Sequence, residues 1–156
     1  MEIRLANLND VDDILNLLLQ VHKVHSDVRP DIFKPGQRKY EKDELISIIN
    51  NPNSPVYVYL DDNNKLIGYI FTIYKEIKDN HSLQNLKTLY IDDLCVDKNY
   101  RKQKVATKLF EYVVKVATNN NCYNITLNVY NFNQEAMKLY EKVGMKALKT
   151  TMEKIL

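Results

Sequence analysis

The sequence predicts an α/β (α+β) domain with a mixed, mostly antiparallel sheet of six to seven strands and helices on both of its faces. Apolar residues alternate with period two in some segments and recur at helical spacing in others. Their order is strand, two helices, three strands, helix, strand, helix, strand. Strands that follow one another directly in the chain imply antiparallel pairing. The later strand–helix–strand unit implies a parallel crossover. The length of 156 residues fits a single domain over 1–156.

The individual elements follow from these periodicities and from the turn residues between them. Arg29-Pro30 ends the first helix because the residue before a proline disfavours helical dihedrals. Asp61-Asp62-Asn63-Asn64 has the composition of a hairpin turn. The expected strands are 2–5, 56–60, 66–74, 88–96, 125–129 and 145–156, and the expected helices are 11–28, 40–50, 106–118 and 134–143.

Composition narrows the class of protein. A net charge of +2 is too small to indicate a nucleic-acid or membrane partner. No apolar run approaches the roughly 20 residues of a membrane span, and the first residues lack a signal-peptide pattern. Cys95 and Cys122 have neither metal nor redox spacing. We therefore expect a cytoplasmic protein with two reduced cysteines.

The segment from Tyr90 to Leu109 carries the clearest chemical pattern. A strand containing Asp92 and Asp93 runs into a turn with Arg101, Lys102 and Lys104, and this turn opens directly into a helix. No Ser, Thr, Asp or Asn precedes the helix to cap it, so its first N–H groups are open to an external anion such as a phosphate. The alternative is a solvated basic surface.

A second pattern lies between residues 131 and 144. Ala136, Leu139, Tyr140 and Val143 form an apolar helical face, while Asn133 suits the N-cap and Gly144 the C-cap. A hydroxyl on or beside that face needs a partner. Taken alone, Tyr140 is better explained by a structural role than by a catalytic one.

Together the two patterns resemble the GNAT superfamily of acyl-CoA-dependent N-acyltransferases. The matching residues are Arg101-x-x-x-x-Ala106 after Asp92-Asp93-Leu94-Cys95-Val96, and Asn133-x-x-Ala136-x-x-Leu139-Tyr140-x-x-x-Gly144. The resemblance implies that acetyl-CoA is the cosubstrate. The implied contacts are Leu94, Cys95 and Val96 along the pantetheine arm, the backbone of Arg101, Lys102, Gln103, Lys104, Val105, Ala106 and Thr107 around the pyrophosphate, Asn133 on the pantetheine, and Tyr140 at the thioester sulfur.

One departure from the family pattern concerns the turn. The family usually has glycine where this chain has Lys104, and often another where it has Lys102. Glycine permits close backbone approach and unusual dihedrals. Lysine still offers its N–H group, but its side chain could crowd a phosphate.

The expected reaction is direct attack of an amine on acetyl-CoA. An alkyl ammonium with a pKa near 10.4 needs about 4.6 kcal/mol to lose its proton at pH 7, which favours a general base. Asp92 and Asp93 are the candidates. Strand alternation places them on opposite faces, and the resemblance favours Asp92. Alternatively, both carboxylates only bind a cationic substrate or a neighbouring helix. Tyr140 is expected to stabilise the leaving thiolate by hydrogen bonding.

The acceptor site is less clear in the sequence. The resemblance places it around His25, Arg29 and Phe33. His22 and His25 are three residues apart, but without a third ligand no metal site is expected. The predicted activity is N-acetyl transfer to a primary amine of a small molecule or peptide, with a homodimer left open. The alternatives are a non-catalytic CoA-binding module and, disfavoured by the small net charge, a nucleic-acid binder.

Overall fold

The computed structural model describes residues 1–156 and contains one sheet of five strands in the order β1-β2-β3-β4-β5. The strands are β1 (Glu2–Leu5), β2 (Val56–Leu60), β3 (Leu66–Ile77), β4 (Leu86–Val96) and β5 (Asn124–Leu127). The first four strands pair antiparallel, and β5 joins β4 in parallel. The predicted mixed, mostly antiparallel class is therefore confirmed, although the sheet has fewer strands than expected.

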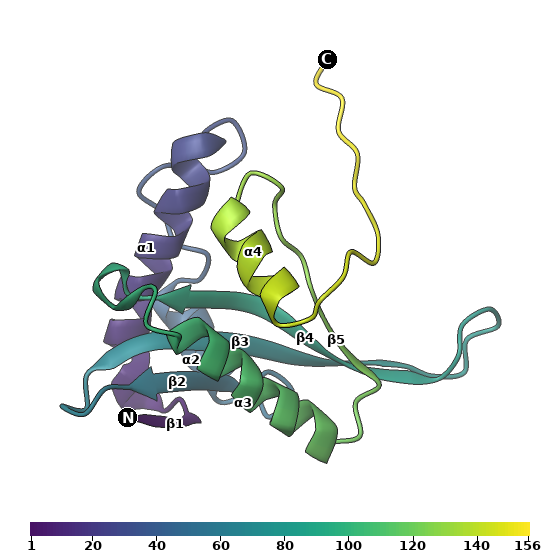
Figure 1. Ribbon diagram of the computed structural model, residues 1–156, viewed down its shortest axis with the longest axis horizontal. Helices are drawn as coiled ribbons and strands as arrows, with labels where there is room; N and C mark the ends of the chain where they lie inside the picture. The colour runs from purple at the N-terminus through teal and green to yellow at the C-terminus, as the bar shows by residue number, and fades with distance from the viewer.

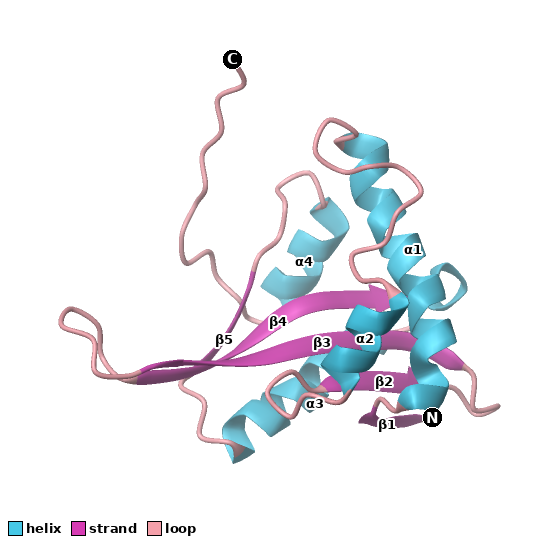
Figure 2. Cartoon of the chain, turned by 180° about the vertical axis from the view of Figure 1, so that it is seen from behind, coloured by secondary structure: helices cyan, strands magenta, loops and turns pink.

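The helices cover both faces of this sheet (Figures 1 and 2). They are α1 (Val11–Val28), α2 (Lys42–Ile49), α3 (Val105–Asn119) and α4 (Gln134–Lys142), with single 3-10 turns at Leu8–Asp10 and Lys98–Tyr100. One core cluster joins α1 and α2 to the sheet, and a second joins α3 to the opposite face. Alternation along β2 explains the two cores, because Val56 and Val58 belong to the first and Tyr57 and Tyr59 to the second.

The predicted last strand at 145–156 is wrong. This segment forms no regular structure, and every residue after Met145 is exposed. The prediction rested on residue type, whereas a strand also needs a neighbouring strand to accept its backbone hydrogen bonds. In Figure 1 the segment leaves the body of the protein and ends in solvent.

The C-terminal ends of β4 and β5 separate from each other. Their parallel pairing runs from Thr88↔Asn124 to Ile91↔Leu127 and stops there. β4 continues to Val96 with β3 as its only neighbour. A wedge therefore opens between the last residues of β4 and the chain that follows β5.

None of the helices is long and apolar enough to cross a membrane.

Candidate functional site

The wedge exposes one backbone edge of β4 over residues 92–96. Side chains contact three backbone groups of residues 92–96, and one of these contacts is from Nζ of Lys39 to the Asp92 carbonyl at 2.8 Å. The Leu94 N–H donates to Oδ1 of Asp93 at 2.9 Å, and Nε of Arg101 donates weakly to the Val96 carbonyl at 3.5 Å. An extended ligand can therefore add to this edge as a further strand would.

A β-bulge sets the direction of the two carboxylates. Phe71 pairs with Asp93 and Thr72 pairs with Ile91, so Asp92 is an extra residue in β4. A bulge interrupts the strict alternation of side chains. Both carboxylates consequently reach tyrosines that pack around Phe71 on the α1–α2 face. The expectation that the two aspartates lie on opposite faces is wrong for this reason.

Asp92 contacts a lysine and a tyrosine through one carboxylate oxygen. Its Oδ2 accepts hydrogen bonds from Nζ of Lys39 at 2.8 Å and from the Tyr40 hydroxyl at 2.6 Å. Burial and then the Asp92 carboxylate raise the pKa of Tyr40, so this tyrosine stays a donor. Asp92 therefore anchors the segment before α2.

Asp93 lies between two tyrosines. Its Oδ2 accepts from the Tyr69 hydroxyl at 3.0 Å. Burial raises the pKa of Asp93 above its ordinary value, and this effect exceeds the lowering by Lys39 and by the Tyr69 hydrogen bond. Burial and then the charge of Asp93 raise the pKa of Tyr140. The charge of Asp93 therefore reaches the Tyr140 hydroxyl.

The basic turn has the backbone that its glycine-rich counterparts would have. Lys102 and Lys104 both adopt left-handed dihedrals, with φ of 62° and 63°. Lys104 is the N-cap of α3 and makes no side-chain capping bond, as the sequence predicts. The first intrahelical bond is from the Lys108 N–H to the Lys104 carbonyl. The preceding N–H groups at the start of α3 therefore remain available to an anion.

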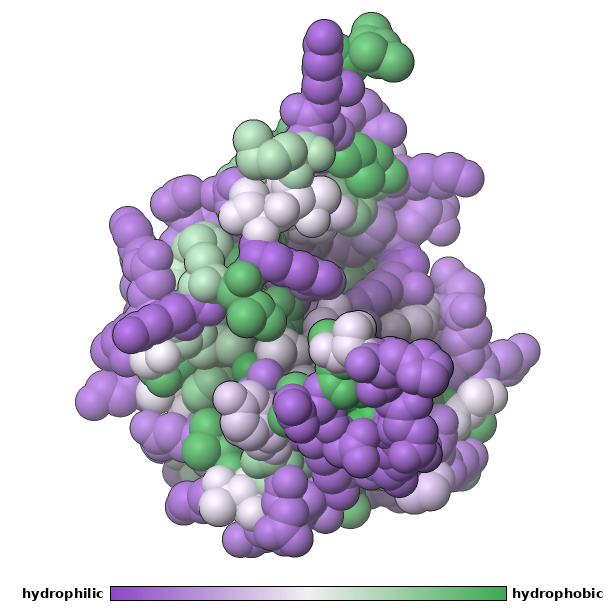
Figure 3. Space-filling model, turned by 90° about the vertical axis from the view of Figure 1, so that its right-hand side faces the viewer, coloured by the Kyte–Doolittle hydropathy of each residue, from purple (hydrophilic) through white to green (hydrophobic).

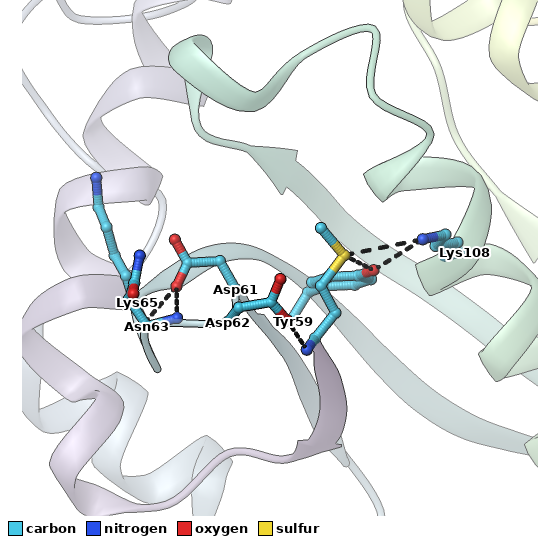
Figure 4. A network of polar contacts seen from close by, with 7 residues as sticks. Tyr59, Asp61, Asp62, Asn63, Lys65 and Lys108 are labelled. Atoms are coloured by element: carbon cyan, nitrogen blue, oxygen red, sulfur yellow. Dashed lines mark hydrogen bonds and ion pairs between the residues drawn. The ribbon is translucent and has the colours of Figure 1, made fainter.

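Lys108 does not belong to this anion site. Its Nζ lies 3.2 Å from the Tyr59 hydroxyl, on the side of α3 that faces β2 (Figure 4). A depression of about 330 Å³ lies there, lined by Met1, Ile3, Tyr59, Lys108, Glu111, Tyr112 and Lys115. In the same region, the N-terminal ammonium of Met1 donates a hydrogen bond to Oδ1 of Asp62. This depression is separate from the wedge.

The predicted acceptor residues fall into an aromatic cluster and one ion-pair group. His25 and Phe33 stack with ring centroids 5.1 Å apart, and Tyr130 and Phe132 complete the cluster from the chain after β5. Nδ1 of His25 is buried without a hydrogen-bond partner. Arg29 instead pairs with Asp31 and Glu153.

The remaining predicted contacts hold local structure. Asn133 caps α4 by accepting from the Ala136 N–H at 3.2 Å, as the sequence predicts. Its amide nitrogen is still available to a ligand. Cys95 is buried beneath α1, where burial first and the Asp93 charge next raise the pKa of its thiol to about 12. This environment disfavours a nucleophilic cysteine.

Sequence reasoning missed the tyrosines and the lysine that contact the aspartates, namely Tyr40, Tyr69 and Lys39. They come from segments far from the aspartates in the chain, so no spacing marks them. Tyr130 and Phe132 were also missed. Their signal is the alternation of aromatic residues with asparagine over 130–133, shortly after β5.

The strand order and the uncapped start of α3 agree with the class of transferase that the sequence resembles, and comparison with known families supports the same class. The family model described as "Acetyltransferase (GNAT) family" matches residues 19–145. The chain belongs to this family.

Two curated relatives each match part of this chain, and one solved structure matches all of it. It is 32% identical over 105 residues to thialysine N-epsilon-acetyltransferase of Bos taurus, covering 67% of this chain and 54% of that protein. It is 31% identical over 87 residues to N-alpha-acetyltransferase 30 of Dictyostelium discoideum, covering 56% and 44%. The chain thus spans about half the length of these relatives. A crystal structure of a BH1408 mutant from Bacillus halodurans superimposes with a TM-score of 0.97 at 31% identity, covering 100% of this chain and 99% of that one.

Proposed function

We propose that the protein transfers an acetyl group from acetyl-CoA to a primary amine by direct attack. The observation that carries this proposal is the open backbone edge of β4, which leads into the uncapped start of α3, and the effect of the Asp93 charge on the pKa of Tyr140 supports it. Family membership supports the same conclusion. The whole chain, 1–156, acts as one domain in this proposal.

The cosubstrate would lie along the open edge of β4. Leu94, Cys95 and Val96 would pair with the pantetheine arm through their backbone, and Asn133 would contact it from the start of α4. The N–H groups from Arg101 to Thr107 would bind the pyrophosphate. The left-handed dihedrals of Lys102 and Lys104 support this fit, because they give the turn the shape that glycines would otherwise provide.

Asp93 is the proposed general base. Its raised pKa brings the carboxylate nearer to the operating pH, where a base is more effective. Asp92 is a poorer candidate because its carboxylate forms an ion pair with Lys39 at 2.8 Å, and a paired carboxylate has less tendency to accept a proton. In the proposed reaction the amine nitrogen bonds to the acetyl carbon, the carbon–sulfur bond breaks, and Asp93 accepts the amine proton directly or through water.

Tyr140 is the proposed donor to the departing sulfur. An ordinary tyrosine has a pKa near 10, above the roughly 8.5 of a thiol, and the structure raises the pKa of Tyr140 further. The hydroxyl therefore remains protonated and stabilises the thiolate by hydrogen bonding.

The acceptor is proposed to be a cationic amine of a small molecule or a peptide. The aromatic cluster of His25, Phe33, Tyr130 and Phe132 lies on the α1 side of the site, and the faces of such rings attract ammonium groups. The named relatives act on a thialysine side-chain amine and on an α-amine, both primary. Their names therefore support a primary-amine acceptor.

The test is release of free thiol from acetyl-CoA across a panel of primary amines. We expect turnover with at least one amine. We expect Asp93→Asn to lower kcat at least tenfold, and Asp92→Asn to act chiefly through stability, because it loses the Lys39 contact. Tyr140→Phe should lower kcat while leaving the affinity for acetyl-CoA nearly unchanged. CoA binding without turnover on any amine would reject catalysis. An Asp93→Asn variant with full activity would reject only the assignment of the base.

A further inference from the structure

Asp92 and Asp93 are carboxylates that lie away from the charged surface of the protein. Hydrophilic residues cover most of the face of the molecule that Figure 3 shows, and water and salt screen the charges on such a surface. The side chain of Asp92 is only 14% exposed, and Asp93 is half-buried. A cation close to these two groups therefore changes their charge more than it would change the charge of a surface carboxylate.

Lys39 is the cation that lies against them. Its Nζ donates to Oδ2 and to the backbone carbonyl of Asp92, both at 2.8 Å. Asp93 follows Asp92 directly in β4, and its own hydrogen bond comes from Tyr69. Burial raises the pKa of Asp93, and the charge of Lys39 acts against this effect. The Lys39 ammonium therefore favours the ionised form of Asp93 without contacting it.

The neighbour of Lys39 in the chain holds it at this point. The ring of Tyr40 stacks on Phe71 with centroids 5.7 Å apart, and its hydroxyl donates to Oδ2 of Asp92 at 2.6 Å. Phe71 is 2% exposed and pairs with Asp93 in the sheet. The core of the sheet therefore fixes the backbone of Lys39, so the placement of its ammonium does not depend on the flexible side chain alone.

The other titratable groups that face Asp93 carry no positive charge. They are Asp92 and Cys95 on β4, Tyr69 on β3, Tyr40 before α2 and Tyr140 on α4. The tyrosines and the thiol stay protonated at pH 7, because burial raises their pKa values. The charge of Asp92 raises the pKa of Asp93 and so opposes its ionisation. Among these groups, Lys39 alone supplies a positive charge.

We propose that Lys39 is a positioning residue of the transfer reaction, whose ammonium, held by its contact with Asp92, keeps Asp93 ionised and sets the lowest pH at which the protein transfers an acetyl group. This inference rests on the proposed function, because it takes Asp93 as the general base. Only an ionised carboxylate can accept the proton of the amine nitrogen as that nitrogen bonds to the acetyl carbon and the carbon–sulfur bond breaks. Without the ammonium, burial and Asp92 keep Asp93 protonated up to a higher pH, so activity is lost at low pH.

The first test is the pH profile of kcat/KM, which reports the ionisation of the free enzyme and the free substrates. Lys39→Met and Lys39→Gln both remove the charge, and Lys39→Arg retains it. The ionisation of a single acceptor amine is the same for every variant and cancels in the comparison. The ratio of kcat/KM at pH 8 to that at pH 6 should rise at least about threefold in Lys39→Met and Lys39→Gln, and it should stay within about twofold of the wild-type ratio in Lys39→Arg.

Tyr40→Phe is the matched control for a purely structural role of Lys39. It removes the 2.6 Å hydrogen bond to Asp92 but retains the ammonium, so it should lower the Tm without changing the ratio. The side chain of Lys39 is 40% exposed, so its replacement should leave the fold intact. A ratio that stays at the wild-type value in Lys39→Met and Lys39→Gln would overturn the proposal, as would an equal rise in Tyr40→Phe.

The second test requires no turnover. The side-chain carboxyl carbons of aspartate are labelled with carbon-13, and the Asp93 signal is assigned by its loss in Asp93→Asn. The midpoint of its NMR titration should lie at higher pH in Lys39→Met than in the wild type and should return in Lys39→Arg. Turnover with equal midpoints in the wild type and Lys39→Met would overturn the inference and leave the proposed function standing. Shifted midpoints without turnover on any amine would support the action of Lys39 on Asp93 and reject the proposed function alone.

Discussion

Replacement of Lys104 by glycine tests whether the turn before α3 is under backbone strain. A non-glycine residue in the left-handed region costs about 1–2 kcal/mol, and Lys104 has φ of 63°. Glycine removes this cost but adds about 0.4–1 kcal/mol of unfolded-state entropy. We therefore expect the relief of this dihedral to contribute about 0.5–1 kcal/mol to the stability of Lys104→Gly. For a domain of this size, that contribution corresponds to a rise in Tm of about 1–4 °C.

Lys104→Ala is the matched control, because alanine removes the charge but retains the Cβ that disfavours this dihedral. Loss of a cation at a helix N-terminus is itself favourable by about 0.3–1 kcal/mol, and both variants share this gain. The difference between glycine and alanine therefore isolates the dihedral. It should be about 1 kcal/mol in favour of glycine by urea denaturation.

The same two variants separate shape from charge in the binding of acetyl-CoA. If backbone N–H groups bind the pyrophosphate, Lys104→Gly should retain most of the affinity measured by calorimetry. If Lys104→Gly instead destabilises the fold by roughly 1 kcal/mol, as glycine does in a helix interior, the idea that Lys104 is under backbone strain is refuted. A large loss of affinity in both variants would show that the ammonium, and not the turn, holds the cofactor.

Three further changes test the core and the two buried polar groups. Leu45→Ala, at a side chain with 0% exposure, should cost about 3 kcal/mol in urea denaturation, whereas the half-exposed Leu8→Ala should cost under about 0.5 kcal/mol. Arg4→Met removes two hydrogen bonds of 2.7 and 2.9 Å to Asp10. Burial raises the pKa of Asp10, but Arg4 and the Asn7 N–H together lower it below its ordinary value. The variant should therefore lose about 2 kcal/mol of stability at pH 7, and less of this difference should remain below the ordinary aspartate pKa. Burial, and next the charge of neighbouring cations, lower the pKa of His25. The wild type should therefore lose stability as the pH falls below about 6.5, the ordinary pKa of histidine. His25→Phe should flatten this dependence in thermal melts from pH 7 to 5.

Most of the fold could be predicted from periodicity and capping residues. The helix at Gln134–Lys142 begins one residue after its Asn133 cap and ends before Gly144, whose φ of 88° suits glycine. The strands of the first hairpin were also located correctly. The tail at 145–156 could not be predicted, because its β-forming composition does not specify a partner strand.

The candidate site also has a part that the sequence could predict and a part that it could not. The chain order alone brings the basic turn to the start of α3 and Tyr140 to α4, since both motifs are local. The contacts of the aspartates are not local. Lys39 and Tyr40 approach Asp92 from more than fifty positions away, and Tyr69 approaches Asp93 from the neighbouring strand.

The sequence by itself determined the family pattern, the order of elements and the uncapped helix, because each depends on residues within a few positions of one another. Only the tertiary structure decided which side chains each aspartate contacts. A single extra residue in β4 reverses the side-chain alternation beyond it, and this bulge exists only through the pairing with β3. Register between strands is a long-range property, so it places Asp93 at the wedge and turns Asp92 toward Lys39.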